Sequence, residues 1–102
     1  MQFGRVDVKS LVNVQNTFTR SEIDKVADAL ITLGTAIKPV VVAKGGWNDE
    51  IGNFEYEVIE NHLVAVAVQQ ANQLKPKDWE TVQAFIVEKG DSLTAVNTLM
   101  NS

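Results

Sequence analysis

The chain has no cysteine, a single histidine and only two arginines among its 102 residues. Without cysteine, disulfide scaffolds, thiolate catalysis and zinc sites with cysteine ligands are excluded. The lack of cysteine fits a reducing compartment, and the first five residues lack the charged and then apolar pattern of a signal peptide. We therefore expect a cytoplasmic protein.

Long apolar runs and clustered positive charge are also missing. The longest apolar run, Leu63 to Val68, has six residues, whereas a helix that crosses a bilayer needs about 20, so no membrane contact is expected. The net charge is −4, and the arginines and lysines are scattered along the chain. Because nucleic-acid affinity depends mainly on clustered cations that neutralise phosphates, tight autonomous DNA binding is disfavoured.

What is present is typical of one globular domain. The length fits a single domain over residues 1–102. Apolar residues make up 45% of the chain and charged residues 22%, which is ordinary for a folded protein with its own core.

The first third of the chain predicts a strand and then a helix. Residues 2–9 mix apolar and polar side chains, and Val6 and Val8 alternate with Asp7 and Lys9, which is typical of a strand. Thr19 and Glu22 match a capping box, and apolar residues at helical spacing follow them. We expect a helix over about 21–33 that ends in the left-handed conformation at Gly34.

Residues 38–68 have the strongest apolar signal. Pro39 opens a strand whose three valines, 40–42, show no alternation, which is typical of an inner strand buried on both faces. Residues 44–53 contain three glycines, two asparagines and an aspartate, which predicts a loop longer than a tight hairpin. Residues 54–59 alternate again, which predicts a half-exposed strand.

Asn61 is expected to cap a helix over about 62–74, since asparagine is a good N-cap and tolerates left-handed backbone angles. The apolar stripe of this helix is wide, so we expect it to be covered on most sides. A turn at 75–78 precedes a largely buried strand at 82–87, and a short terminal helix is expected over 93–100. The predicted fold is α+β, a small mixed β-sheet with helices packed on it, in the order β-α-β-β-α-β-α.

A resemblance to a known family runs through the middle of the chain. Gly34 is followed by Pro-Val-Val-Val at 39–42, by Tyr-Glu-Val-Ile-Glu-Asn-His at 56–62 and by Ala67. In order and spacing this resembles the N-terminal domain of ParB-like proteins in the ParB/sulfiredoxin superfamily. There, a Pro-led strand and a hairpin precede a "YEVIEGHRR" segment that opens an Ala-containing helix. The resemblance spans roughly residues 3–88 and implies a ParB/sulfiredoxin-like fold.

The departures from the family pattern concern its phosphate site. The paired arginines that hold nucleotide phosphates in the family correspond to Leu63 and Val64, and the family glycine corresponds to Asn61. Arginine suits this task because its planar fork donates two parallel hydrogen bonds. The resemblance therefore implies a degenerate member that keeps the scaffold. CTP binding and hydrolysis are not expected, nor is a sulfiredoxin-type reaction, which needs a cysteine, and no cofactor is expected.

The candidate binding residues are Lys44, Trp47, Glu60, Asn61 and His62. His62 beside Glu60 has the chemistry of a general base or metal ligand, but a lone histidine is a poor catalytic set, so a turn or capping role is the favoured interpretation. Lys44 precedes two glycines without the order of a phosphate loop. Trp47 has two interpretations that stay open: an anchor for a partner or a base, or a side chain folded over the core.

Other residues suggest weaker alternatives. Glu55 and Glu57, with Asp49, Glu50 and Glu60 nearby, have the oxygen ligands of a calcium or magnesium site, but a solvated strand face is the favoured interpretation, and no metal is expected. Trp79 is expected to pack on the sheet edge. No serine lies in a nucleophile-elbow pattern.

Three hypotheses of function follow. The first is a non-catalytic ParB-like interaction module that docks a protein partner, or a second copy of itself, through the Trp47 loop or an exposed sheet edge. The second is nucleic-acid or nucleotide binding, with or without nuclease activity. It requires one basic face formed by Lys38, Lys44, Lys75 and Lys77. The third is a small-ligand enzyme that uses Glu60 and His62, which requires a concave pocket around both.

Overall fold

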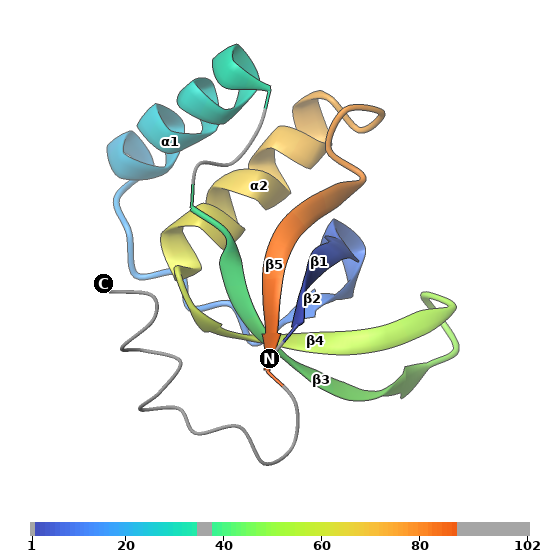
Figure 1. The fold of residues 1–102 in the computed structure, drawn as a ribbon. Coiled ribbons are helices and arrows are strands. Elements are labelled where there is room, and N and C mark those ends of the chain that lie inside the picture. Colours follow the sequence, from blue (N-terminus) through green and yellow to red (C-terminus); the bar gives the residue numbers. More distant parts are fainter. Residues whose placement is uncertain (1, 35–37, 88–102) are drawn as a thin grey trace.

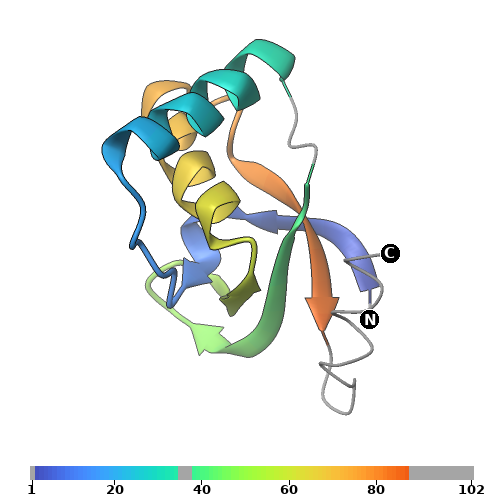
Figure 2. The ribbon, with the colours of Figure 1, turned by 90° about the vertical axis from the view of Figure 1, so that its left-hand side faces the viewer.

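The structure is a computed structural model that describes residues 2–34 and 38–87. A mixed five-stranded sheet has helix α2 (His62–Leu74) against one face, and helix α1 (Arg20–Leu33) packs on α2 (Figures 1 and 2). The predicted α+β class with a small mixed sheet is confirmed. No helix in this described part is both long and apolar enough to cross a bilayer.

The middle strand of the sheet is β3, and both edge strands come from the first part of the chain. In spatial order the strands are β1 (Gln2–Asp7), β5 (Thr81–Val87), β3 (Val40–Asn48), β4 (Asn53–Glu60) and β2 (Leu11–Val12). β3 is parallel to β5 and antiparallel to β4, β1 is antiparallel to β5, and β2 is parallel to β4. The central place of β3 explains its run of valines, because Val40, Val41 and Val42 are all fully buried.

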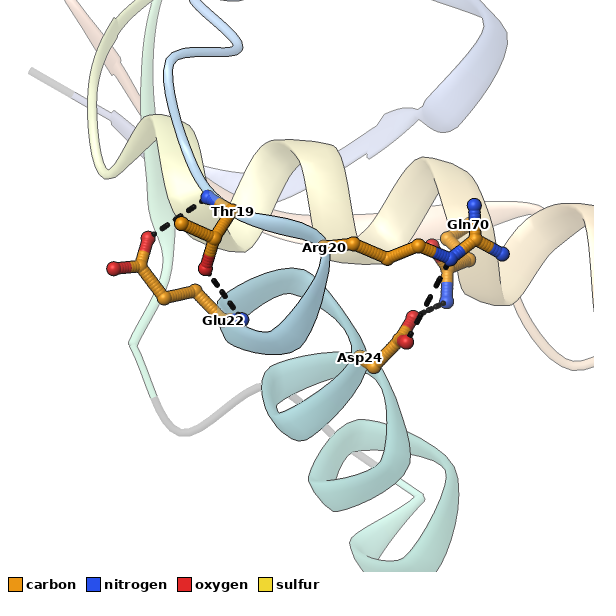
Figure 3. Close-up of polar contacts among 5 residues, drawn as sticks. All are labelled: Thr19, Arg20, Glu22, Asp24 and Gln70. Atoms are coloured by element: carbon orange, nitrogen blue, oxygen red, sulfur yellow. Dashed lines mark hydrogen bonds and ion pairs between the residues drawn. The ribbon is translucent and has the colours of Figure 1, made fainter.

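Helix α1 begins and ends as its sequence predicts. The Thr19 hydroxyl accepts a hydrogen bond from the backbone N–H of Glu22 at 3.2 Å, and the Glu22 carboxylate accepts one from the Thr19 N–H at 3.2 Å (Figure 3). These bonds satisfy donors that the first helical turn leaves free. Gly34 follows with a φ of 74°, the left-handed conformation that glycine adopts without strain.

Helix α2 is more enclosed than α1. Its buried residues are Ala65, Val66, Ala67, Val68 and Ala71. Three of these are alanines, and short side chains let a helix approach its neighbours closely. This agrees with the wide apolar stripe in the sequence, because the sheet lies on one side of the helix and α1 on the other (Figure 2).

The loop predicted over residues 44–53 is wrong in its length. β3 continues to Asn48 and β4 starts at Asn53, so the connection is the four-residue turn from 49 to 52. The first two glycines lie at an irregularity in the β3–β4 pairing between Lys44 and Trp47, and a Cβ on Gly45 would lie 3.1 Å from the Glu55 carbonyl oxygen. Glycine here permits a bulge and a close backbone approach, not a loop.

The element order also differs from the predicted one. β1 ends at Asp7, and a short 3₁₀ helix η1 (Val8–Ser10) leads into β2, which the sequence does not predict. Two apolar residues are too few to show a strand period. The terminal helix expected over 93–100 lies outside the described residues.

The main core lies between the sheet and the helices. Trp79 is only 4% exposed and belongs to this core, so the expected place at the sheet edge is wrong. Its backbone carbonyl accepts a hydrogen bond from the Asn72 amide at 2.9 Å, which fixes the chain after α2 against that helix. A smaller cluster around Val41 and Val87 lies on the opposite face of the sheet, with Ile59 and Phe85 packed against it.

Candidate functional site

The β3–β4 hairpin extends beyond the rest of the sheet (Figure 1). β5 pairs with β3 only over Val40–Ala43, and β2 pairs with β4 only at Tyr56 and Glu57. Within the described residues, 44–48 therefore pair with β4 alone and 53–55 pair with β3 alone. We call these two stretches and their turn, residues 44–55, the arm.

Trp47 lies on the arm and stays 57% exposed. Its ring meets Phe54 on the facing strand edge to face, with centroids 5.2 Å apart and planes at 86°. Its indole N–H donates a hydrogen bond to Asp49 Oδ1 at 2.7 Å. Of the two interpretations of Trp47, the one in which it folds over the core is wrong. The side chain is held in place and yet open to solvent.

Lys44 adds a positive charge beside this aromatic pair. Its ammonium lies 4.1 Å from the centroid of the Phe54 ring, which is a cation–π contact. Asn53, at the base of the turn, donates to Asp7 Oδ2 at 2.8 Å and so ties the arm to the end of β1. Lys44, Phe54 and Trp47 thus form a fixed, exposed surface that presents aromatic edges and one positive charge.

The turn between β4 and α2 is built around Asn61. This residue has a φ of 62° and a ψ of 43°, the left-handed conformation expected from its type. The expected side-chain cap is wrong, since its amide instead donates to the Pro39 carbonyl at 2.6 Å and makes no side-chain bond to the helix. The backbone geometry explains why glycine suits this position in the resembling family and why asparagine can replace it.

His62 has a structural partner. Its Nδ1 accepts a hydrogen bond from the backbone N–H of Gln15 at 3.1 Å, which fixes the connection before α1 against the start of α2. The turn role favoured from the sequence therefore has a specific contact behind it. Glu60 is exposed beside it, at the end of β4.

The acidic residues of β4 do not converge on a common point. Glu55 accepts a hydrogen bond from the Asn48 amide at 3.2 Å, and Glu57 is exposed. Across residues 2–34 and 38–87, no three His, Asp or Glu side chains come close enough to hold a metal ion.

Leu63 and Val64 occupy the place where the resembling family has arginines. Both are partly buried, and Val64 packs against the main core. A cavity of about 490 Å³ lies between the two helices, and one of about 270 Å³ lies beside the end of α2. Neither is lined by Glu60 or His62, so neither supplies the pocket that the enzyme hypothesis requires.

The lysines of the nucleic-acid hypothesis do not gather in one place, although Lys75 and Lys77 lie close together in the chain. The Asn61–Pro39 bond places the neighbouring Lys38 beside the start of α2. Lys75 follows the other end of this 13-residue helix, about 20 Å away at 1.5 Å per residue. Lys44 lies on the arm. The expected single basic face therefore does not form from these residues.

Solved structures share this arrangement of sheet and helices. The C-terminally truncated chromosome-partitioning protein ParB from Caulobacter crescentus, complexed with CTP-gamma-S, is similar with a TM-score of 0.63 and 14% identity. The fold is ParB-like. A conserved hypothetical protein from Pyrococcus furiosus is similar with a TM-score of 0.62, also at 14% identity. The ParB-like fold expected from the sequence resemblance is thus confirmed.

The similarity covers most of this chain but only part of the other two chains. The two matches cover 96% and 90% of this chain but only 50% and 34% of the other chains. This chain therefore spans about half of the truncated Caulobacter chain and about a third of the Pyrococcus chain. No family model and no curated protein sequence matches the chain. At this identity the similarity shows the fold alone.

Sequence reasoning misses one feature, the cavity between the two helices. Its lining includes three glutamines of α2, Gln69, Gln70 and Gln73. The sequence does show these three polar residues close together, directly after the apolar run of α2 and around the buried Ala71. This is the one sequence signal that could have indicated a polar lining beside the helix. The cavity itself depends on where α1 lies, which the sequence pattern does not give.

Proposed function

We propose that the chain is a non-catalytic ParB-like interaction module that contacts a protein partner, or a second copy of itself, through the arm. The observation behind this proposal is Trp47, an aromatic side chain that is exposed and yet fixed by Phe54 and Asp49. Interface anchors are commonly tryptophan, and a side chain already held in one conformation loses little entropy on binding.

The edge of the arm supports the same proposal. Within the described part of the chain, β4 residues 53–55 have no strand on their outer side. A partner segment can add to such an edge through backbone hydrogen bonds, with Phe54 and Trp47 beside it to supply apolar contacts. An exposed strand edge can pair with another chain unless it is protected. In this stretch of β4, Asn53 and Glu55 are the polar residues on either side of Phe54.

The arm is tested by comparing two exposed aromatics. Trp47 and Phe3 are each 57% exposed, but Phe3 lies on β1, away from the arm. If the arm binds a second copy, Trp47→Ala should abolish self-association in sedimentation velocity. If it binds another protein, Trp47→Ala should abolish crosslinking to that partner from a photoreactive group at position 54. Phe3→Ala should leave both unchanged. Equal behaviour of the two variants would contradict the role of the arm.

A separate experiment tests whether the chain binds nucleotides. Leu63 and Val64 offer no charge to a phosphate, so we expect no heat of binding when CTP or ATP is titrated into the protein by calorimetry. Micromolar binding that is lost on mutation of the turn at 61–64 would overturn this part of the proposal. It would leave the arm untouched.

The alternative, nucleic-acid binding in the manner that the ParB-like fold suggests, predicts salt-sensitive affinity. A gel-shift assay at low and at physiological salt distinguishes it. With the lysines spread over the molecule, we expect no shift at physiological salt, and a strong salt-dependent shift would favour the alternative over the interaction module.

A further inference from the structure

A groove between the two helices is lined by both apolar and polar side chains. It holds about 490 Å³, within the range of roughly 300–1,000 Å³ that is usual for ligand sites. It is lined by the connection before α1, the first turns of α1 and the middle of α2: Asn16, Phe18, Arg20, Ile23, Val66, Gln69, Gln70 and Gln73. The groove shares no residue with the arm or with the Asn61 turn.

The lining combines apolar and carboxamide groups. Phe18, Ile23 and Val66 are apolar, and the other uncharged residues all end in an amide. A carboxamide both donates and accepts hydrogen bonds, which is what the amide groups of a peptide backbone require. A ligand that offers backbone amides and one apolar side chain therefore matches both parts of the lining.

One glutamine is already held in position. Gln70 donates to Asp24 Oδ1 at 3.0 Å, and Arg20 Nε lies 3.9 Å from Asp24 Oδ2 (Figure 3). Asp24 thus joins α1 to α2 at the rim of the groove. The Arg20 side chain remains 91% exposed, so its guanidinium can also contact a ligand carboxylate.

The other two glutamines have a spacing that suits an extended chain. Gln69 and Gln73 are four residues apart on α2, which is about 6 Å along the helix axis. An extended peptide presents amide groups on the same side every second residue, about 6.6 Å apart. The two carboxamides can therefore each pair with successive backbone amides on one edge of such a peptide.

We propose that this groove binds an extended peptide segment of a partner protein. An apolar side chain of the segment sits against Phe18, Ile23 and Val66, its backbone pairs with Gln69 and Gln73, and a neighbouring acidic residue faces Arg20. The inference does not depend on the proposed role of the arm, because the two surfaces share no residue.

The probe for this proposal is a displayed library of random 12-residue peptides, selected on the full chain. We expect enriched peptides with an apolar residue next to or near an acidic one. Their affinity, measured by fluorescence anisotropy, should fall about tenfold or more in Gln69→Ala/Gln73→Ala, because two hydrogen bonds are lost. Arg20→Gln should weaken only those peptides that contain the acidic residue.

The controls separate this site from folding and from the arm. Alanine favours helix, so the double variant should keep its melting temperature. Gln2→Ala, on the edge strand β1 and outside the groove, should bind as the wild type does, and so should Trp47→Ala. No enrichment on the wild type, or enriched peptides that bind the double variant equally well, would overturn the proposal.

Discussion

At the scale of single residues, Asn61 shows how one side chain can serve two needs. Its backbone lies in the left-handed region, and its amide reaches Pro39 at 2.6 Å, just before the central strand. The start of α2 is thereby tied to the start of β3. A residue chosen from its type as a helix cap is in fact a link between two elements.

The two roles of Asn61 can be separated by substitution. Asn61→Gly loses the bond but keeps the backbone angle, and should lower the free energy of unfolding by about 1 kcal/mol. Asn61→Ala also has to hold a left-handed angle, which adds about 1–2 kcal/mol of cost. Urea unfolding measures both. If alanine were as stable as glycine at this position, the left-handed angle would not be a constraint.

At the scale of elements, β3 has two functions along its length. Its first residues form the buried centre of the sheet, and its last residues form one side of the arm. The sequence predicts the first part, because a run of valines indicates burial on both faces. It does not predict the second, because glycines that permit a bulge have the same composition as glycines that form a loop.

The two glycines of the arm should differ when they are replaced. A Cβ on Gly45 would lie 3.1 Å from the Glu55 carbonyl oxygen, whereas a Cβ on Gly46 meets nothing within 4 Å. Gly46→Ala should be neutral or slightly stabilising, because it restricts the unfolded chain. Gly45→Ala should be less stable than Gly46→Ala by about 1 kcal/mol, since the strands must move apart. Thermal melting of the two variants, followed by circular dichroism, checks this order.

At the scale of the whole molecule, the fold was more predictable than the surfaces. Apolar periodicity indicates the two helices and the β4 strand, and an unbroken apolar run indicates the inner strand, because burial imposes both patterns directly. The strand β2 and the groove depend on contacts between segments distant in the sequence. Leu11 pairs with Tyr56, and Arg20 lines the same groove as Gln73. No local pattern records such pairs.

Placing a charged side chain at a buried position of α2 should affect the stability of the whole molecule. Val68 is fully buried, so Val68→Asp places a carboxylate in the core without a partner. Its cost of several kcal/mol is comparable to the total stability of about 5–15 kcal/mol, so we expect no cooperative melting by circular dichroism. Val66 is 8% exposed and borders the groove, where a carboxylate can reach water. Val66→Asp should therefore still melt cooperatively, and the reverse order would contradict this placement of the two valines.

The pairing of β1 with β5 affects the order in which the molecule is assembled. Gln2 lies opposite Ile86 and Phe3 opposite Phe85, so the start of the described chain pairs with its last part, whereas β3, β4 and α2 follow one another directly. Contacts between distant segments cost more chain entropy to form than local ones. During synthesis, β1 has to wait for β5 to leave the ribosome, while the β3–β4–α2 segment can already form. A nascent chain stopped before residue 81 would thus present the edge of β3 that β5 later covers.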